Sequence, residues 1–154
     1  MIYMDMIDHC YFINLDKRID RKKHIIENVM TFFNFNESQY SRFSAIDTSN
    51  ENCFAARSVG CALSHINVLK DAINKKYKHI LVLEDDFEPI IDTKTFTTNW
   101  KYFVNNYTDF NVCQLSYKNI ITPIACDESE IVYFCSNSQT ASAYVINLQF
   151  ASTI

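Results

Sequence analysis

The stretch His79-Ile80-Leu81-Val82-Leu83-Glu84-Asp85-Asp86 decides the fold, because an unbroken apolar run ends in three carboxylates. The run from Ile80 to Leu83 is typical of a strand covered on both faces, as in parallel sheets flanked by helices. Ligands of such sheets bind at the carboxyl ends of the strands. Adjacent acids repel one another, and hard oxygen ligands suit Mg²⁺ or Mn²⁺, so the stretch predicts a metal site. The alternative is a solvated acidic turn closed by Pro89.

The bulk composition is that of an ordinary globular domain. The 154 residues are 48% hydrophobic and 21% charged, which is enough chain for one domain with a core. A net charge of -4 disfavours nucleic acid as a partner, because phosphate binding needs a basic face. No run approaches the roughly 18 apolar residues of a membrane span, and Asp5 and Asp8 stand where a signal peptide would be cationic and then apolar. We therefore expect a cytoplasmic protein without a transmembrane segment.

The cysteine pattern predicts free thiols. Six cysteines are present, at Cys10, Cys53, Cys61, Cys113, Cys126 and Cys135. They form no C-x-x-C pair, and a domain of this size does not need disulfides. We expect them to be reduced and unpaired, and their spacing does not predict a zinc site.

Hydrophobic periodicity predicts helices and strands in alternation, followed by consecutive strands. Strands are predicted at residues 10–15, 40–46, 80–83, 112–116, 131–135 and 141–146. Helices are predicted at residues 20–33, from Ser58 to about residue 74, and at 96–107, and a further helix begins near Gln149. This order indicates a mixed α/β sheet.

The helix that begins near Ser58 is expected to bury one apolar stripe. The stripe consists of Val59, Ala62, Leu63, Ile66, Leu69, Ala72 and Ile73. Ser64 and His65 lie inside the same helix, where no sharp turn could present a serine nucleophile. We expect a buried or half-buried hydrogen-bonding pair.

A charged turn follows the first strand, at Asn14–Arg21. In one interpretation, Arg18 or Arg21 binds a diphosphate together with the free amides of the next helix. In the other, Asp16 and Asp20 cap that helix and the cations are solvated. The spacing favours neither.

Five stretches, taken in order, resemble glycosyltransferase family 25, which includes lipooligosaccharide galactosyltransferases and collagen galactosyltransferases. They are Tyr11–Arg18, Arg42–Asp47, Gly60–His65, Leu83–Asp86 and Thr140–Ile146. Together they span nearly the whole chain. The resemblance implies an α/β, GT-A-like nucleotide-sugar-binding fold with a mixed, mostly parallel central sheet flanked by helices. It also implies that residues 1–154 are a single domain of this family that lacks or shortens the C-terminal end.

The activity that the resemblance implies is metal-dependent sugar transfer. A hexose, galactose or glucose, would move with inversion from a UDP-sugar to a glycan or a hydroxylated protein acceptor. Mn²⁺ or Mg²⁺ would be held by Asp86 first and Asp85 second, and would stabilise the charge that grows on the leaving diphosphate. Such a role fits lipopolysaccharide biosynthesis.

Further residues are assigned to the donor and to catalysis. The donor site is expected to include Asn14, Arg18, Arg21, Ser64, His65, Glu84 and Thr140. Asn14 is placed near the nucleoside, Arg18 and Arg21 near the diphosphate, and Glu84 near the ribose or behind the metal ligands. Inversion also requires a general base for the acceptor hydroxyl. The catalytic candidates are Asp85, Asp127 and Glu130, with Glu128 in the same loop.

Three other functions compete with catalysis of sugar transfer. A truncated or degenerate transferase could bind the nucleotide sugar without transferring it. A nucleotidyl or phosphoryl transferase is disfavoured because Gly60 is the only glycine and no glycine-rich phosphate loop exists. An interaction module is disfavoured because no exposed apolar stripe is expected. The transferase hypothesis requires Glu84, Asp85 and Asp86 to share one open pocket with the Asn14–Arg21 turn.

Overall fold

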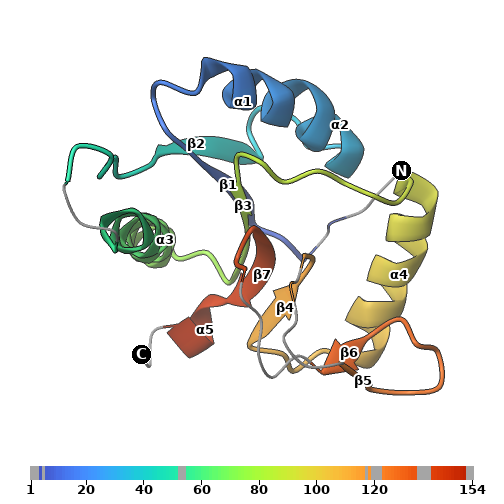
Figure 1. Ribbon diagram of the computed structural model, residues 1–154. Coiled ribbons are helices and arrows are strands. Elements are labelled where there is room, and N and C mark those ends of the chain that lie inside the picture. The colour runs from blue at the N-terminus through green and yellow to red at the C-terminus, as the bar shows by residue number, and fades with distance from the viewer. Residues whose placement is uncertain are drawn as a thin grey trace.

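A computed structural model shows one mixed sheet between helices (Figure 1). The structure describes residues 4, 6–51, 55–116, 118, 123–134 and 140–151. The central sheet contains β1 (His9–Asn14), β2 (Tyr40–Ser44), β3 (His79–Glu84), β4 (Val112–Gln114) and β7 (Ala143–Asn147). A separate hairpin is formed by β5 (Ile124–Ala125) and β6 (Tyr133–Phe134).

Helices follow the strands largely as the sequence predicts. The helical segments are α1 (Ile19–His24), the π-helical turn η1 (Ile25–Val29), α2 (Met30–Phe33), α3 (Ala56–Asn74), α4 (Thr93–Asn106) and α5 (Leu148–Ala151). The first three form the continuous helix predicted at residues 20–33. Helix α4 begins earlier than predicted because the side chain of Asp92 caps it, accepting a hydrogen bond from the Thr95 amide at 2.9 Å.

The sheet order is β2-β1-β3-β7-β4. Strand β1 pairs in parallel with both β2 and β3, and β7 runs antiparallel to β3 and β4. This confirms the expected α/β fold with a mixed, mostly parallel sheet flanked by helices. The carboxyl ends of β1, β2 and β3 therefore lie at the same edge, where Ile13 pairs with Glu84 and Asn14 with Ser44.

The two faces of the sheet build two cores, because successive side chains of a strand point to opposite faces. On one face, Phe12 and Leu83 pack with the α1–α2 segment and with Trp100 and Phe103 of α4. The residues on the other face that pack with α3 and α5 are Tyr11, Ile13, Ile80 and Val82. The prediction that β3 is covered on both faces is confirmed.

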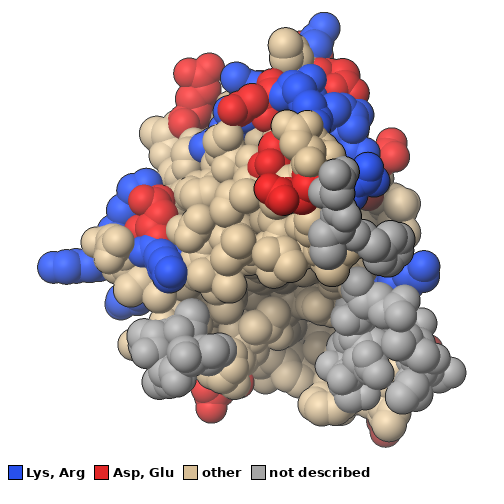
Figure 2. Space-filling view, turned by 60° about the vertical axis from the view of Figure 1, so that its left-hand side comes forward, with Lys and Arg blue, Asp and Glu red and all other residues tan. Residues whose placement is uncertain are grey.

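The predicted apolar stripe of α3 is confirmed only at Ala72, which is buried, and Leu69, which packs against the core, and is wrong for its other members. The buried residues of α3 are Gly60, Ser64, Val68 and Ala72. Val59, Leu63 and Ile66 are instead 51%, 42% and 44% exposed. Small residues let the helix lie close to the sheet edge, so the larger apolar side chains are turned toward solvent. An exposed apolar face therefore exists, contrary to expectation, and Figure 2 shows a mostly uncharged surface in the middle of the view, with charges at the top and at the left-hand edge.

Gly60 marks the closest approach of α3 to the loop after β2. A Cβ atom at this position would lie 2.8 Å from the Ile46 carbonyl oxygen and 2.8 Å from Thr48 Oγ1. Neither distance is allowed for a real Cβ, and the backbone carbonyl cannot rotate away. The glycine is therefore required by packing rather than by an unusual φ angle.

We expect Gly60→Ala to lower the unfolding midpoint, since overpacking of about 1–3 kcal/mol outweighs the gain of about 1 kcal/mol in helix propensity. Ser58→Ala, at an exposed position of the same helix, is the control and should leave the midpoint unchanged or raise it. Thermal melts followed by circular dichroism measure both. A Gly60→Ala protein as stable as wild type would show that the helix can move away from the loop.

The thiols agree with the expectation as far as they are described. Cys10, Cys61, Cys113 and Cys126 are free, while Cys53 and Cys135 lie outside the described residues. Among the described residues 131–134 of the predicted strand at 131–135, the strand is Tyr133–Phe134, which pairs with β5 and not with the central sheet. Within the described parts of the chain, no helix combines the length and the apolar character that crossing a membrane requires.

Candidate functional site

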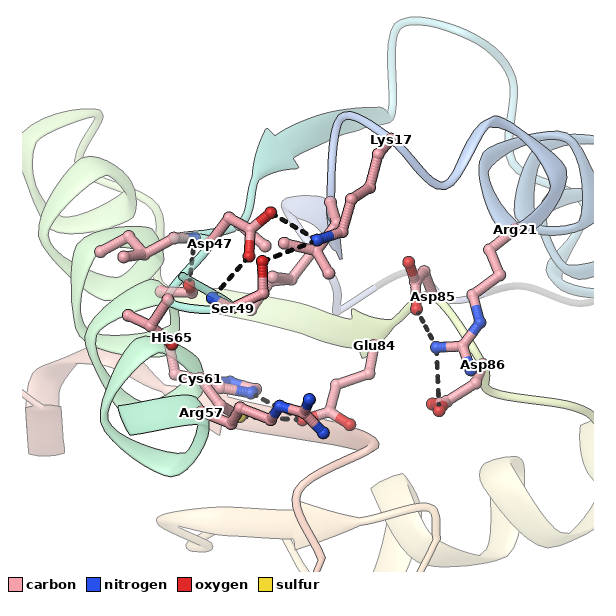
Figure 3. Close-up of a pocket in the computed structure, with 16 residues that line it drawn as sticks. Lys17, Arg21, Asp47, Ser49, Arg57, Cys61, His65, Glu84, Asp85 and Asp86 are labelled. Carbon is pink, nitrogen blue, oxygen red and sulfur yellow. Dashed lines mark hydrogen bonds and ion pairs between the residues drawn. The ribbon is translucent and has the colours of Figure 1, made fainter. Parts of the chain in front are cut away.

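A pocket of about 460 Å³ opens between α3 and the turn that follows β1 (Figure 3). This size lies within the range typical of small-molecule sites. Its lining residues are Ile13, Leu15, Lys17, Arg21, Ala45, Ile46, Asp47, Thr48, Ser49, Arg57, Cys61, Ser64, His65, Glu84, Asp85 and Asp86. The three consecutive carboxylates thus share one pocket with the charged turn, as predicted.

Asp85 and Asp86 converge on a single cationic atom. Arg21 Nη1 donates to Asp85 Oδ1 at 2.8 Å and to Asp86 Oδ2 at 3.2 Å. Asp85 is buried, whereas Asp86 is exposed. The two carboxylates therefore present oxygens to one point at the rim of the pocket, and the Arg21 guanidinium offsets their repulsion.

Asn14 lies behind these carboxylates and organises the end of β1. Its Nδ2 donates to Asp85 Oδ2 at 2.7 Å and to the Arg18 carbonyl at 3.0 Å, and its Oδ1 accepts from Arg42 Nε at 2.8 Å. The side chain is buried and is not among the pocket-lining residues. Its contacts orient Asp85 and Arg42, and the nucleoside contact expected from the sequence stays a prediction.

The cationic side chains of the charged turn differ in their contacts. Arg21 faces the pocket, whereas Arg18 does not line it and pairs with Asp20 at 2.6 Å. Lys17 closes the opposite rim by donating to Asp47 at 2.7 Å and to Ser49 at 2.9 Å. The hydrogen bond from Lys17 holds the pKa of Asp47 well below its usual range. Of the two arginines considered for diphosphate binding, Arg21 lines the pocket and Arg18 does not.

Arg57 is a pocket residue that the sequence reasoning missed. It lies in the first turn of α3 and extends toward Glu84 in Figure 3. Within the part of the chain that the structure describes, Arg57 forms no ion pair, while Lys17 and Arg21 are both paired with carboxylates. No motif surrounds it, so only the direction of α3 toward the sheet edge identifies it.

Ser64 and His65 are both hydrogen-bonded, in agreement with the prediction, but in different directions. Ser64 Oγ donates to the Gly60 carbonyl at 2.7 Å and accepts from the Ile46 amide at 2.9 Å, so it joins α3 to the loop after β2. His65 Nδ1 lies 2.9 Å from the Tyr144 hydroxyl, and its Nε2 lies 3.2 Å from Glu84 Oε1.

Glu84 is the last residue of β3, and its side chain faces α3. Its carboxylate accepts hydrogen bonds from His65 and, at 3.3 Å, from the Cys61 thiol. The bond from His65 lowers the pKa of Glu84. Burial, followed by the neighbouring Glu84 charge, raises the pKa of Cys61 to about 11.

The remaining predicted site residues lie elsewhere. Asp127 accepts hydrogen bonds from Tyr102 at 2.9 Å and from Tyr107, beside α4. Asp127 and Glu130, with Glu128, belong to the β5–β6 loop and are not among the pocket-lining residues. Thr140 also lies outside the lining, next to Ser142 at 2.5 Å.

Comparison with known proteins identifies the family. The sequence profile of glycosyltransferase family 25, described as LPS biosynthesis protein, matches residues 54–154. No curated protein matches the chain significantly. The matched range is about two thirds of the chain and contains both Gly60–His65 and Leu83–Asp86, and each of these two stretches contributes residues to the pocket lining. The chain therefore belongs to glycosyltransferase family 25.

Proposed function

We propose that the pocket binds a UDP-sugar and that the domain transfers its hexose, galactose or glucose, with inversion to a glycan or hydroxylated protein acceptor. The observation that carries this proposal is the convergence of Asp85 and Asp86 at the rim of a pocket in a family 25 domain. The pocket lies at the carboxyl ends of parallel strands, where such folds bind nucleotides.

A divalent cation fits the charges of this pocket. Its lining carries four carboxylates and three cationic side chains, so without a metal it would not attract a diphosphate. Carboxylate oxygens are ligands that Mn²⁺ and Mg²⁺ prefer. Asp86 and Asp85 would hold the cation in place of their contact with Arg21. When bound, the cation would neutralise charge on the diphosphate.

The side chains around the pocket can account for the rest of the donor. Ile13, Leu15, Ala45 and Ile46 form an apolar wall suited to a nucleobase. Glu84 is proposed to accept a hydrogen bond from the ribose. Arg57 is proposed to bind the diphosphate, because a guanidinium forms short, charge-assisted hydrogen bonds to phosphate oxygens.

We expect Arg57→Ala to weaken UDP binding by about tenfold or more, since a hydrogen bond to a charged group contributes about 1.5–3 kcal/mol. Lys70→Ala, at an exposed position of α3, is the matched control and should bind UDP as wild type does. Calorimetric titration of UDP in the presence of Mn²⁺ measures both. Equal affinities of the two variants would remove Arg57 from the site.

The general base that deprotonates the acceptor hydroxyl is expected to lie where the acceptor binds. Asp127 and Glu130 remain the candidates from the sequence, and a role for either would require an acceptor that bridges the β5–β6 loop and the pocket. The hydrogen bond from Ser129 and those from the two tyrosines lower the pKa of Asp127, which makes its carboxylate a weaker base. A base role for Asp127 would therefore require an acceptor that displaces these donors.

The direct test of transfer is the release of UDP from UDP-galactose and UDP-glucose with and without Mn²⁺. We expect metal-dependent release that is faster with one donor than with other nucleotide sugars, and that increases when a glycan acceptor is added. UDP binding without any release would instead support the alternative of a degenerate domain. A protein that neither binds UDP nor releases it from a UDP-sugar would contradict the proposed function.

A further inference from the structure

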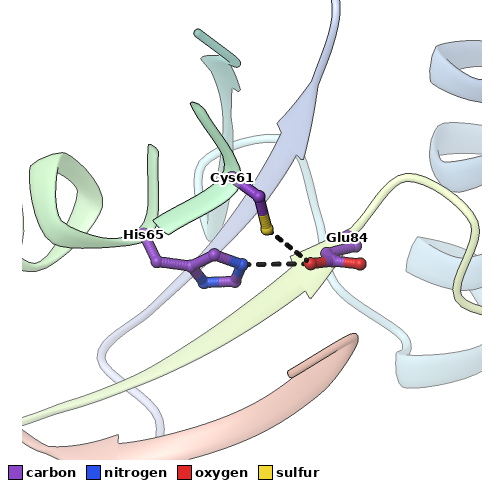
Figure 4. A group of neighbouring side chains, drawn as sticks. All are labelled: Cys61, His65 and Glu84. Atoms are coloured by element: carbon purple, nitrogen blue, oxygen red, sulfur yellow. Dashed lines mark hydrogen bonds and ion pairs between the residues drawn. The ribbon is translucent and has the colours of Figure 1, made fainter. Parts of the chain in front are cut away.

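Three potential metal ligands of different chemistry meet on one wall of the pocket (Figure 4). Cys61 Sγ lies 3.3 Å from Glu84 Oε1, and His65 Nε2 lies 3.2 Å from the same oxygen. All three ligand atoms lie within 4.8 Å of one another. This cluster contains a thiol and an imidazole, which distinguishes it from the carboxylate pair at the other end of the pocket.

The fold explains why these side chains converge. Cys61 and His65 are four residues apart on α3, so they lie on the same face of the helix. Glu84 ends β3, and its side chain points from the sheet toward that face (Figure 4). Burial of the small residues Gly60 and Ser64 brings α3 close enough for the three side chains to touch.

We propose that Cys61, His65 and Glu84 form a site for Zn²⁺. Zinc bonds of about 2.0–2.3 Å to sulfur, nitrogen and oxygen place neighbouring tetrahedral ligand atoms roughly 3.3–3.8 Å apart. The distances of 3.3 Å and 3.2 Å in the structure are close to these values. Zinc binding replaces the thiol proton of Cys61, which is released to solvent, and it requires the ring proton of His65 to move from Nε2 to Nδ1, where the Tyr144 hydroxyl can accept its hydrogen bond.

The histidine is already oriented as a zinc ligand requires. Its Nδ1 lies 2.9 Å from the Tyr144 hydroxyl, which leaves Nε2 directed at Glu84. A hydrogen bond on the second ring nitrogen fixes the orientation and the tautomer of ligating histidines. The site supplies three protein ligands, so its fourth position faces the pocket and takes water or an oxygen of a bound molecule.

The ligand types separate this site from the proposed donor metal. Thiolate and imidazole favour Zn²⁺, whereas Asp85 and Asp86 offer only hard oxygens that suit Mn²⁺ or Mg²⁺. The zinc site does not depend on the proposed function, because it requires no nucleotide. The two cations can therefore be tested separately in the same protein.

Zinc affinity is measured by competition with a chromophoric chelator, using reduced protein free of metal. We expect one zinc bound by wild type and a loss of affinity of about tenfold or more in Cys61→Ser, because one of three ligands is removed. Cys126→Ser, which removes an exposed thiol outside the pocket, and Asp86→Asn should bind zinc as wild type does. Equal zinc affinity in Cys61→Ser and wild type would overturn the proposal.

Two further readouts keep the test independent of folding defects. Co²⁺ should give a thiolate charge-transfer band in wild type and in Cys126→Ser, but not in Cys61→Ser. Tyr144→Phe keeps all three ligands and loses only the hydroxyl on Nδ1, so its zinc affinity should fall by about 10–100-fold with an unchanged circular dichroism spectrum. A cobalt band that survives in Cys61→Ser would place the metal on another thiol.

Discussion

Asp86→Asn is expected to lose most of the Mn²⁺-dependent affinity for UDP while its fold persists. The amide keeps the size of the side chain but removes a charge that the cation needs. Asp86 is exposed, and Arg21 retains its 2.8 Å contact with Asp85, so the unliganded protein should unfold at nearly the wild-type temperature. Removing one of two adjacent carboxylates also relieves repulsion.

Thermal melts with and without Mn²⁺ and UDP separate these effects. At a hundredfold excess of UDP over Kd, wild type should gain about 2.7 kcal/mol from ligand binding, and Asp86→Asn far less. Asp109→Asn, at an exposed position outside the pocket, is the matched control and should gain as much as wild type. Equal gains in Asp86→Asn and Asp109→Asn would mean that Asp86 does not hold the cation. If the three acids formed only a solvated turn, Asp86→Asn would change neither the unfolding temperature nor the stabilisation by Mn²⁺ and UDP.

Asn14→Ala is expected to destabilise the protein by about 3 kcal/mol, because Asp85 Oδ2 and Arg42 Nε each lose a hydrogen bond at a buried site. The substitution removes the donor to Asp85 at 2.7 Å and the acceptor of Arg42 at 2.8 Å. Both partners are charged, which makes the loss larger than for neutral groups. Loss of the Asp85 contact should also weaken Mn²⁺-dependent UDP binding.

Asn105→Ala, at an exposed position of α4, is the control and should change the free energy of unfolding little. Chemical denaturation of both variants gives the difference. A loss below about 1 kcal/mol for Asn14→Ala would show that water replaces the amide, and that Asn14 does not organise the site.

The strand that ends in Glu84, Asp85 and Asp86 could be predicted from the sequence because two independent signals agree. The apolar run of β3 demands burial on both faces, and its carboxylates mark the sheet edge where ligands bind. The pairing of this edge with the charged turn follows from parallel neighbours, so the location of the pocket was also predictable. These are properties of local pattern and of sheet topology.

The side of α3 that packs on the sheet could not be predicted in the same way. Periodicity favours the face with the largest apolar residues, yet the helix buries Gly60 and Ser64 and exposes Val59 and Leu63. Close approach to the loop after β2 decides the orientation, and that contact is tertiary. The same error concealed the cluster of Cys61 and His65, whose third member comes from another element.

Which of the cationic side chains line the pocket also could not be predicted from the sequence. Their spacing favours Arg18 and Arg21 equally as ligands of a diphosphate. In the structure, Arg18 pairs with its neighbour Asp20, whereas Arg21 pairs with Asp85. Arg57 carries no local signal at all. Partner choice among surface charges depends on distances that arise only after folding.

Paramagnetic broadening by Mn²⁺ tests the central claim most directly, because it locates the cation and needs no acceptor. In ¹⁵N-labelled wild type with UDP and a small fraction of an equivalent of Mn²⁺, amide signals of Leu15–Lys17 and Glu84–Phe87 should lose intensity first. The signals of α4 and of the β5–β6 hairpin should persist. Broadening centred on residues 127–130, or no selective broadening in the presence of UDP, would contradict a donor-metal site at Asp85 and Asp86.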